Sequence, residues 1–78
     1  MKTNITIPTD LWEEDEQCTI TVWLASDGAN VTEGALIAEI MAAKVQHEIE
    51  APASGTLTIL KETEVPADKG EVIGFITS

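Results

Sequence analysis

Apolar and polar residues alternate in the first part of the chain with a period of two, which is typical of β-strands. Ile5 and Ile7 alternate with polar neighbours, and the pattern stops at Pro8. Residues 19–24 are rich in β-branched and aromatic side chains, and the turn residues Asp27-Gly28 follow them. These two patterns predict a first and a second strand.

The middle of the chain allows two interpretations. Residues 36–41 and 45–51 read as two strands, and the second of them has apolar or ring-bearing residues at every other position. However, Ile37, Ile40 and Val45 also fall near helical spacing, and Ala42-Ala43 favours a helix. Local periodicity alone therefore leaves helix and strand open in this window.

An internal repeat favours the strands. Residues 19–22 (TITV) are similar to residues 56–59 (TLTI), and residues 34–40 (GALIAEI) are similar to residues 70–76 (GEVIGFI). Gly74, surrounded by β-branched and aromatic residues, fits a strand better than a helix, and the first copy inherits that assignment. A chance match over so few residues is the alternative. With the repeat, we expect an all-β flattened sandwich of two similar, roughly four-stranded halves related by an approximate two-fold axis.

Length and composition restrict the class of protein. A chain of 78 residues is expected to form one domain, residues 1–78, and 44% hydrophobic with 23% charged residues is an ordinary globular composition. There is no apolar run of the roughly 20 residues that span a bilayer, and no signal-peptide core follows Met1, so we expect a cytoplasmic protein. A single cysteine and a single histidine argue against an internal disulfide and a metal cluster.

The net charge of −10 argues against nucleic acid and anionic membranes as partners, because both carry negative charge themselves. Two interpretations of the charge stay open. It serves solubility alone, or it steers the domain into positively charged clefts of partner enzymes.

Lys44 is the residue that the sequence most clearly marks as a candidate for a chemical role. If residues 36–41 and 45–51 form a hairpin, Ala42-Ala43-Lys44 is its tight connection, and Lys44 lies at an exposed tip. A lysine in such a place is either a solvated charge or an amine that a modifying enzyme acylates, since its flexible four-carbon stem can enter an active site. An acylated lysine would serve as a carrier and do no chemistry of its own.

Over nearly its full length the chain resembles a lipoyl domain of the biotinyl/lipoyl attachment family. The stretches that carry the resemblance are Ile7-Pro8-Thr9-Asp10-Leu11, Val22-Trp23-Leu24, Asp27-Gly28, the segment 34–40 (GALIAEI), Lys44, and Ala51-Pro52-Ala53-Ser54-Gly55. The resemblance implies a barrel-sandwich hybrid, either free-standing or excised from a longer chain. It also implies that Lys44 carries covalent lipoate as a swinging arm for acyl and electron transfer in a 2-oxo acid dehydrogenase-type complex.

The same resemblance implies the partners. A lipoate ligase or lipoyl transferase would load the lysine, acyltransferase and dehydrogenase subunits of a multienzyme complex would use it, and the domain itself would be a monomer without catalytic residues. The recognition hairpin around Lys44 would consist of Met41, Ala42, Ala43 and Val45. It departs from the family pattern, which has Glu-Thr-Asp before the lysine and Ala after it. Two alternatives stay open: a biotin carboxyl carrier, supported by Glu48-Ile49-Glu50-Ala51-Pro52, and an unmodified interaction domain of the same fold.

Other residues receive structural roles. We expect His47 to be a packed strand residue, Trp23 and Phe75 to lie in the core, and Cys18 to be an inert thiol. Trp12 stands beside the acidic run Glu13-Glu14-Asp15-Glu16, where it is either an anchor of the loop, together with Leu11, or a contact for a partner.

Overall fold

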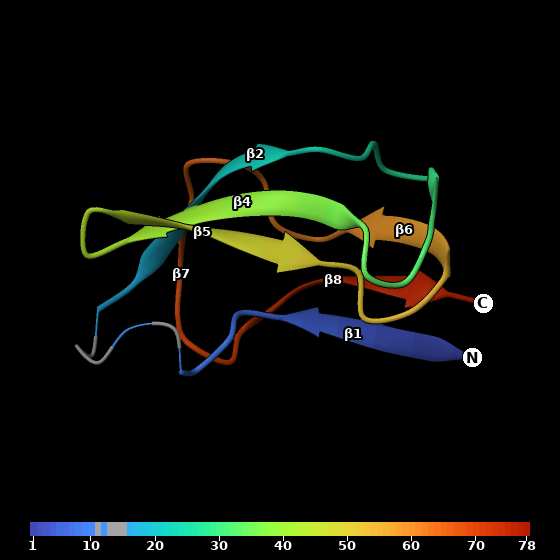
Figure 1. The fold of residues 1–78 in the computed structure, drawn as a ribbon, viewed down its shortest axis with the longest axis horizontal. Helices are drawn as coiled ribbons and strands as arrows, with labels where there is room; N and C mark the ends of the chain where they lie inside the picture. The colour runs from blue at the N-terminus through green and yellow to red at the C-terminus, as the bar shows by residue number, and fades with distance from the viewer. Residues whose placement is uncertain (11, 13–15) are drawn as a thin grey trace.

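Two four-stranded antiparallel sheets face each other in the computed structural model, which describes residues 1–10, 12 and 16–78 (Figure 1). The strands are β1 Lys2–Thr6, β2 Cys18–Trp23, β3 Asn30–Val31, β4 Leu36–Ala42, β5 Val45–Glu50, β6 Gly55–Ile59, β7 Pro66–Ala67 and β8 Val72–Thr77. The window with helical spacing thus consists of β4 and β5, and the prediction of an all-β sandwich is confirmed. The predicted strand bounds were one or two residues off at several ends. Most of the acidic run, and Leu11, fall outside the described residues.

The strand orders show the two-fold relationship that the repeat predicted. One sheet has the order β1-β8-β6-β3 and the other has the order β5-β4-β2-β7. Exchanging β1 with β5, β2 with β6, β3 with β7 and β4 with β8 converts each order into the other. Each half therefore contributes strands to both sheets, and the two halves hold each other together. No helix among the described residues has the length and apolar character needed to cross a membrane.

The equivalence of the halves extends to the strand register. Ile5 pairs with Gly74 between β1 and β8, and Ile49 pairs with Ala38 between β5 and β4. Each ladder shifts register just beyond these pairs, between Gly74 and Val72 in one and between Ala38 and Leu36 in the other. A β-bulge of this kind bends the strand and increases its twist. The same bulge thus shapes both halves.

Branched aliphatic side chains fill the space between the sheets. The fully buried members of this core with the largest volumes are Ile5, Ile7, Ile20, Ile37, Ile40, Leu57, Ile73 and Ile76. Trp23 packs against the core and donates its indole N–H to the carbonyl oxygen of Lys61 at 3.0 Å. The prediction for Phe75 was wrong, because Phe75 lies outside this core, half-buried, with the Lys2 Nζ 4.3 Å from its ring centroid. The bulge places Ile73 and Gly74 both on the inside, so Phe75 falls on the outer face of β8.

The chain ends lie at one end of the molecule, opposite the turn between β4 and β5 (Figure 1). The amino group of Met1 donates to the carbonyl oxygen of Ser78 at 2.8 Å, and the Ser78 N–H donates to the Met1 carbonyl at 2.9 Å. Counting along the equivalent ladders from Ile5 and Ile49, this pair corresponds to the pair of Ala42 and Val45. The termini therefore occupy the place that a hairpin turn has in the other half.

Candidate functional site

A two-residue turn, Ala43-Lys44, joins β4 to β5, since Ala42 and Val45 form the last pair of the ladder. The turn is one residue shorter than the predicted connection Ala42-Ala43-Lys44. Ala43 has φ 50° and Lys44 has φ 66°, so both central residues have the positive φ that marks a type I′ turn. This turn matches the right-handed twist of the strands better than the type I turn that alanine tolerates more easily. The left-handed conformation costs about 1–2 kcal/mol for each residue with a Cβ atom.

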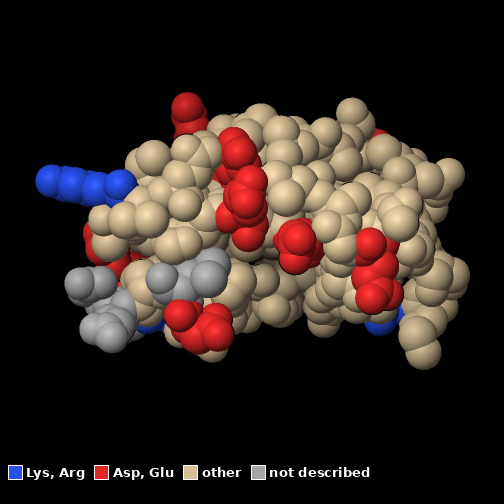
Figure 2. Space-filling model, viewed as in Figure 1, with Lys and Arg blue, Asp and Glu red and all other residues tan. Residues whose placement is uncertain are grey.

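Lys44 differs from the other three lysines in having no partner among the residues that the structure describes. Lys2 covers the ring of Phe75, Lys61 forms an ion pair with Glu71, and Lys69 donates to the carbonyl oxygen of Trp12 at 2.6 Å. Lys44 is exposed and makes no hydrogen bond or ion pair in this part of the chain. Figure 2 shows a lysine side chain, in blue, extending freely at the end of the molecule where the hairpin lies. Its amine is sterically free to enter the active site of another protein.

The residues predicted to form the recognition hairpin lie around Lys44 as expected from their sequence positions, but only some of them face outward. Met41 and Val45 are 40% and 53% exposed, and Ala42 is buried against the core. Ala43 is half-buried in the turn itself. Two exposed apolar side chains, Met41 and Val45, therefore flank the lysine, together with the exposed, uncharged Gln46, which pairs with Met41.

Trp12 and His47 form a contact that the sequence did not predict. Trp12 is only 7% exposed, and its ring stacks on that of His47 with centroids 5.7 Å apart and an interplanar angle of 29°. The indole N–H donates to the Glu16 carbonyl at 2.9 Å, and the Nζ of Lys69 lies 5.2 Å from the centroid of the Trp12 ring. Of the two roles considered, Trp12 has that of the loop anchor. It fixes the segment between β1 and β2 to β5, three residues beyond Lys44.

His47 has the packed position in a strand that its alternation predicted. It pairs with Ile40 of β4, and its Nε2 atom is buried without a hydrogen-bond partner among the described residues. Cys18 is buried at the start of β2, and this burial raises the pKa of its thiol above the usual value. A thiol of this kind carries little thiolate at neutral pH, which agrees with the inert role expected for it.

The comparisons with known proteins point to one family. A search of curated protein sequences finds no significant match. Among solved structures, the chain is similar to the lipoyl domain of the 2-oxoglutarate dehydrogenase complex from Azotobacter vinelandii, solved by NMR. The TM-score is 0.73 at 28% sequence identity, over 95% of this chain and 96% of that one. Residues 3–76 match the profile of the biotinyl/lipoyl family, which is described as "biotin-requiring enzyme". The chain therefore belongs to the biotinyl/lipoyl attachment family, whose domains carry lipoate or biotin covalently on a lysine and have no catalytic activity of their own.

Proposed function

We propose that this protein is a lipoyl carrier and that Lys44 is the residue to which lipoate is attached. The observation that carries the proposal is the free, outward-directed amine of Lys44 at the tip of a two-residue turn, in a protein whose other three lysines are engaged with its own surface. Lipoate is favoured over biotin because the matching solved structure is a lipoyl domain.

The hairpin supplies what an acyl acceptor needs. The turn has only two residues, and Ala42 anchors it in the core, so the backbone beneath Lys44 is held in a single place. The flexible stem of the lysine then carries the amine beyond that backbone, where its nitrogen can attack an activated carboxyl group. The amide C–N bond forms as the bond from the carbonyl carbon to the activating group breaks, the activating group leaves with the electron pair, and the nitrogen gives up a proton. Lipoate bound in this way would supply a ring disulfide that takes up an acyl group and electrons.

The partners follow from this role. A lipoate ligase or lipoyl transferase would load Lys44, and acyltransferase and dehydrogenase subunits of a 2-oxo acid dehydrogenase-type complex would exchange groups with the arm. Because the exposed strand side chains beside Lys44 are the uncharged Met41, Val45 and Gln46, we expect these enzymes to recognise the position of the turn and its uncharged flanks rather than adjacent carboxylates.

The test is the intact mass of the protein after co-expression with a lipoate ligase and lipoate, and separately with a biotin ligase and biotin. We expect the mass increment of one lipoyl group, and we expect the Lys44→Arg variant to lack it completely while Lys2→Arg keeps it. Both substitutions preserve charge at exposed positions, and circular dichroism checks that both variants fold.

Three outcomes would contradict the proposal. A lipoyl increment that persists in Lys44→Arg would move the attachment to another lysine, and a biotinyl increment alone would make the protein a biotin carrier. An unmodified mass under both conditions would leave an interaction domain of the same fold.

A further inference from the structure

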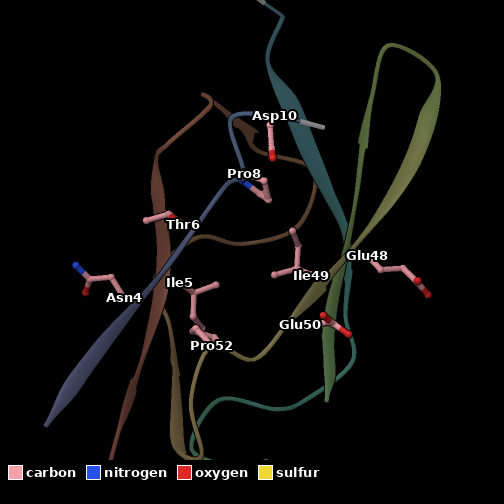
Figure 3. Close-up of a pocket in the computed structure, with 9 residues that line it drawn as sticks. All are labelled: Asn4, Ile5, Thr6, Pro8, Asp10, Glu48, Ile49, Glu50 and Pro52. Carbon is pink, nitrogen blue, oxygen red and sulfur yellow. The ribbon is translucent and has the colours of Figure 1, made fainter. Parts of the chain in front are cut away.

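A groove of about 340 Å³ runs along the side of the sandwich between β1 and β5 (Figure 3). These strands are edge strands of different sheets, and each pairs on one side only, β1 with β8 and β5 with β4. An edge strand presents unpaired backbone N–H and C=O groups along its free side. The groove therefore lies between two free strand edges.

The floor of the groove is apolar and has the two-fold symmetry of the fold. Ile5 and Ile49 are equivalent residues, and their side chains point toward one another across the gap (Figure 3). Pro8 and Pro52 also line it, one from each half. Because both halves place the same residue types there, the fold itself accounts for this floor.

The charge along the rim is not symmetric, and the fold does not account for it. Glu48 and Glu50 line the side of β5, whereas the equivalent positions on β1 are the neutral Asn4 and Thr6. Asp10 adds a third carboxylate, and the described lining contains no lysine. Figure 2 shows acidic residues, in red, spread over this face of the molecule.

Glu48 also has an unfavourable neighbour within the sheet. It pairs directly with Glu39 of β4, and like charges in directly opposed positions of a ladder destabilise it. The Glu39 carboxylate accepts a hydrogen bond from the Gln46 side chain at 2.8 Å, whereas Glu48 has no partner among the described residues. A cation bound beside Glu48 would offset this repulsion.

We propose that this groove binds an extended segment of a partner protein in which lysine or arginine alternates with apolar residues. Such a segment can add its backbone to the free edge of β5 or β1. Its apolar side chains would pack on Pro8 and Pro52, the accessible apolar residues above the buried Ile5 and Ile49. Its cationic side chains would meet Glu48, Glu50 and Asp10. The site goes beyond the lipoyl carrier role of Lys44. Glu48 is four residues further along β5, roughly 13 Å away at strand rise, so a segment bound in the groove leaves the lysine free.

The experiment uses a synthetic heptapeptide of alternating valine and lysine, blocked at both ends, titrated into the full chain labelled with ¹⁵N. We expect the largest amide shifts in residues 4–7 and 48–51. The variant Glu48→Gln/Glu50→Gln should weaken binding about fivefold, which corresponds to about 1 kcal/mol for the two exposed ion pairs together. The matched control Glu33→Gln/Glu62→Gln removes the same charge from exposed positions that do not line the groove, and it should bind as the parent chain does.

A second variant tests the opposite rim. Thr6→Lys adds a positive charge at an exposed position beside the groove and should weaken binding without altering the core. Equal weakening by the control pair, or shifts spread over the whole acidic surface, would overturn the proposal in favour of non-specific attraction. If a peptide of alternating valine and glutamate bound with the same affinity, the proposal that the partner segment is cationic would be wrong. The groove variants should accept lipoate on Lys44 normally, so failure here and failure of the carrier function are separate results.

Discussion

The two halves of the molecule, residues of β1–β4 and residues of β5–β8, build the same ladders and the same bulge, but only one of the two equivalent hairpin positions is closed by a turn. Ala43-Lys44 joins Ala42 to Val45, whereas Ser78 and Met1 pair through their backbone with no residue between them. The strands therefore pair in the same way with the turn and without it. In this fold the ladder geometry alone thus suffices to pair β8 with β1, and a turn is present only where Lys44 lies.

Among substitutions at equivalent positions of the two halves, we expect those at positions 74 and 38 to differ most in their effect on the free energy of unfolding. A Cβ atom at Gly74 would lie 2.6 Å from the carbonyl oxygen of Thr58, whereas the equivalent Ala38 already accommodates a Cβ in the buried core. We expect Gly74→Ala to lower the free energy of unfolding by about 2–3 kcal/mol, in the range of overpacked cores. Urea unfolding followed by the fluorescence of Trp12 and Trp23 measures it.

Ala38→Gly is the matched substitution in the other half. It removes a Cβ from a strand and should cost only about 1 kcal/mol, because glycine loses more backbone entropy on folding. If both substitutions lowered the free energy of unfolding by the same amount, position 74 would have as much space as position 38, and the proposed difference between the halves would be wrong.

A substitution in the turn Ala43-Lys44 should have a smaller effect on stability than Gly74→Ala, and it should stabilise the protein rather than destabilise it. Ala43 has φ 50°, a conformation that glycine adopts without a Cβ penalty. After its own entropy cost, Ala43→Gly should stabilise the protein by about 0.5–1 kcal/mol. Ala29→Gly, at a half-buried loop alanine without a positive φ, should destabilise it, and the thermal midpoints of the two variants provide the measurement. A loss of stability in Ala43→Gly would mean that the turn is not strained.

The smallest effect concerns an ion pair that only the second half has. Lys61 bonds to Glu71 and, together with the backbone N–H of Asp68, lowers the pKa of the Glu71 carboxyl. Leu24 and Ala35 occupy the equivalent positions of the first half, so no such pair exists there.

A lowered pKa in the folded state means that the pair stabilises the protein above the ordinary pKa of glutamate and loses this effect as the pH falls through the lowered value. Glu71→Gln should therefore flatten the decline in stability below about pH 5, and only slightly, since the pair lies at the surface, partly open to solvent, and is screened by salt. An unchanged acid profile, measured by urea unfolding at several pH values, would show that the pair contributes nothing.

The comparison of the halves also shows what the sequence could predict. Hydrophobic alternation predicted the strands, because it depends on local residues. The repeat predicted the sandwich and the two-fold axis, because two similar segments adopt similar structures. Phe75 was assigned to the core because it stands in the apolar run 72–76, which conceals the bulge. The repeat itself contained the better signal, since Phe75 aligns with Glu39, a charged residue on the outer face of β4.

Other features depend on contacts that one sequence does not encode locally. Trp12 and His47 are far apart along the chain, and only the path of the loop beside β5 brings their rings together. The sequence placed Lys44 at a hairpin tip, but the alanine that precedes it gave no sign of a type I′ turn, which normally selects Gly, Asn or Asp. The twist of the paired strands imposes that turn, and twist is a property of the assembled sheet.

The positions of the chain ends and of Lys44 have a mechanical consequence. The molecule extends 34 Å along its longest axis and only 19 and 18 Å across the others, and the ends and the Lys44 turn lie at opposite poles of that long axis. Any chain attached at either end would leave from the pole furthest from the lysine. The rigid domain would then lie between the attached chain and Lys44, and its own length would add to the distance that the lysine can reach.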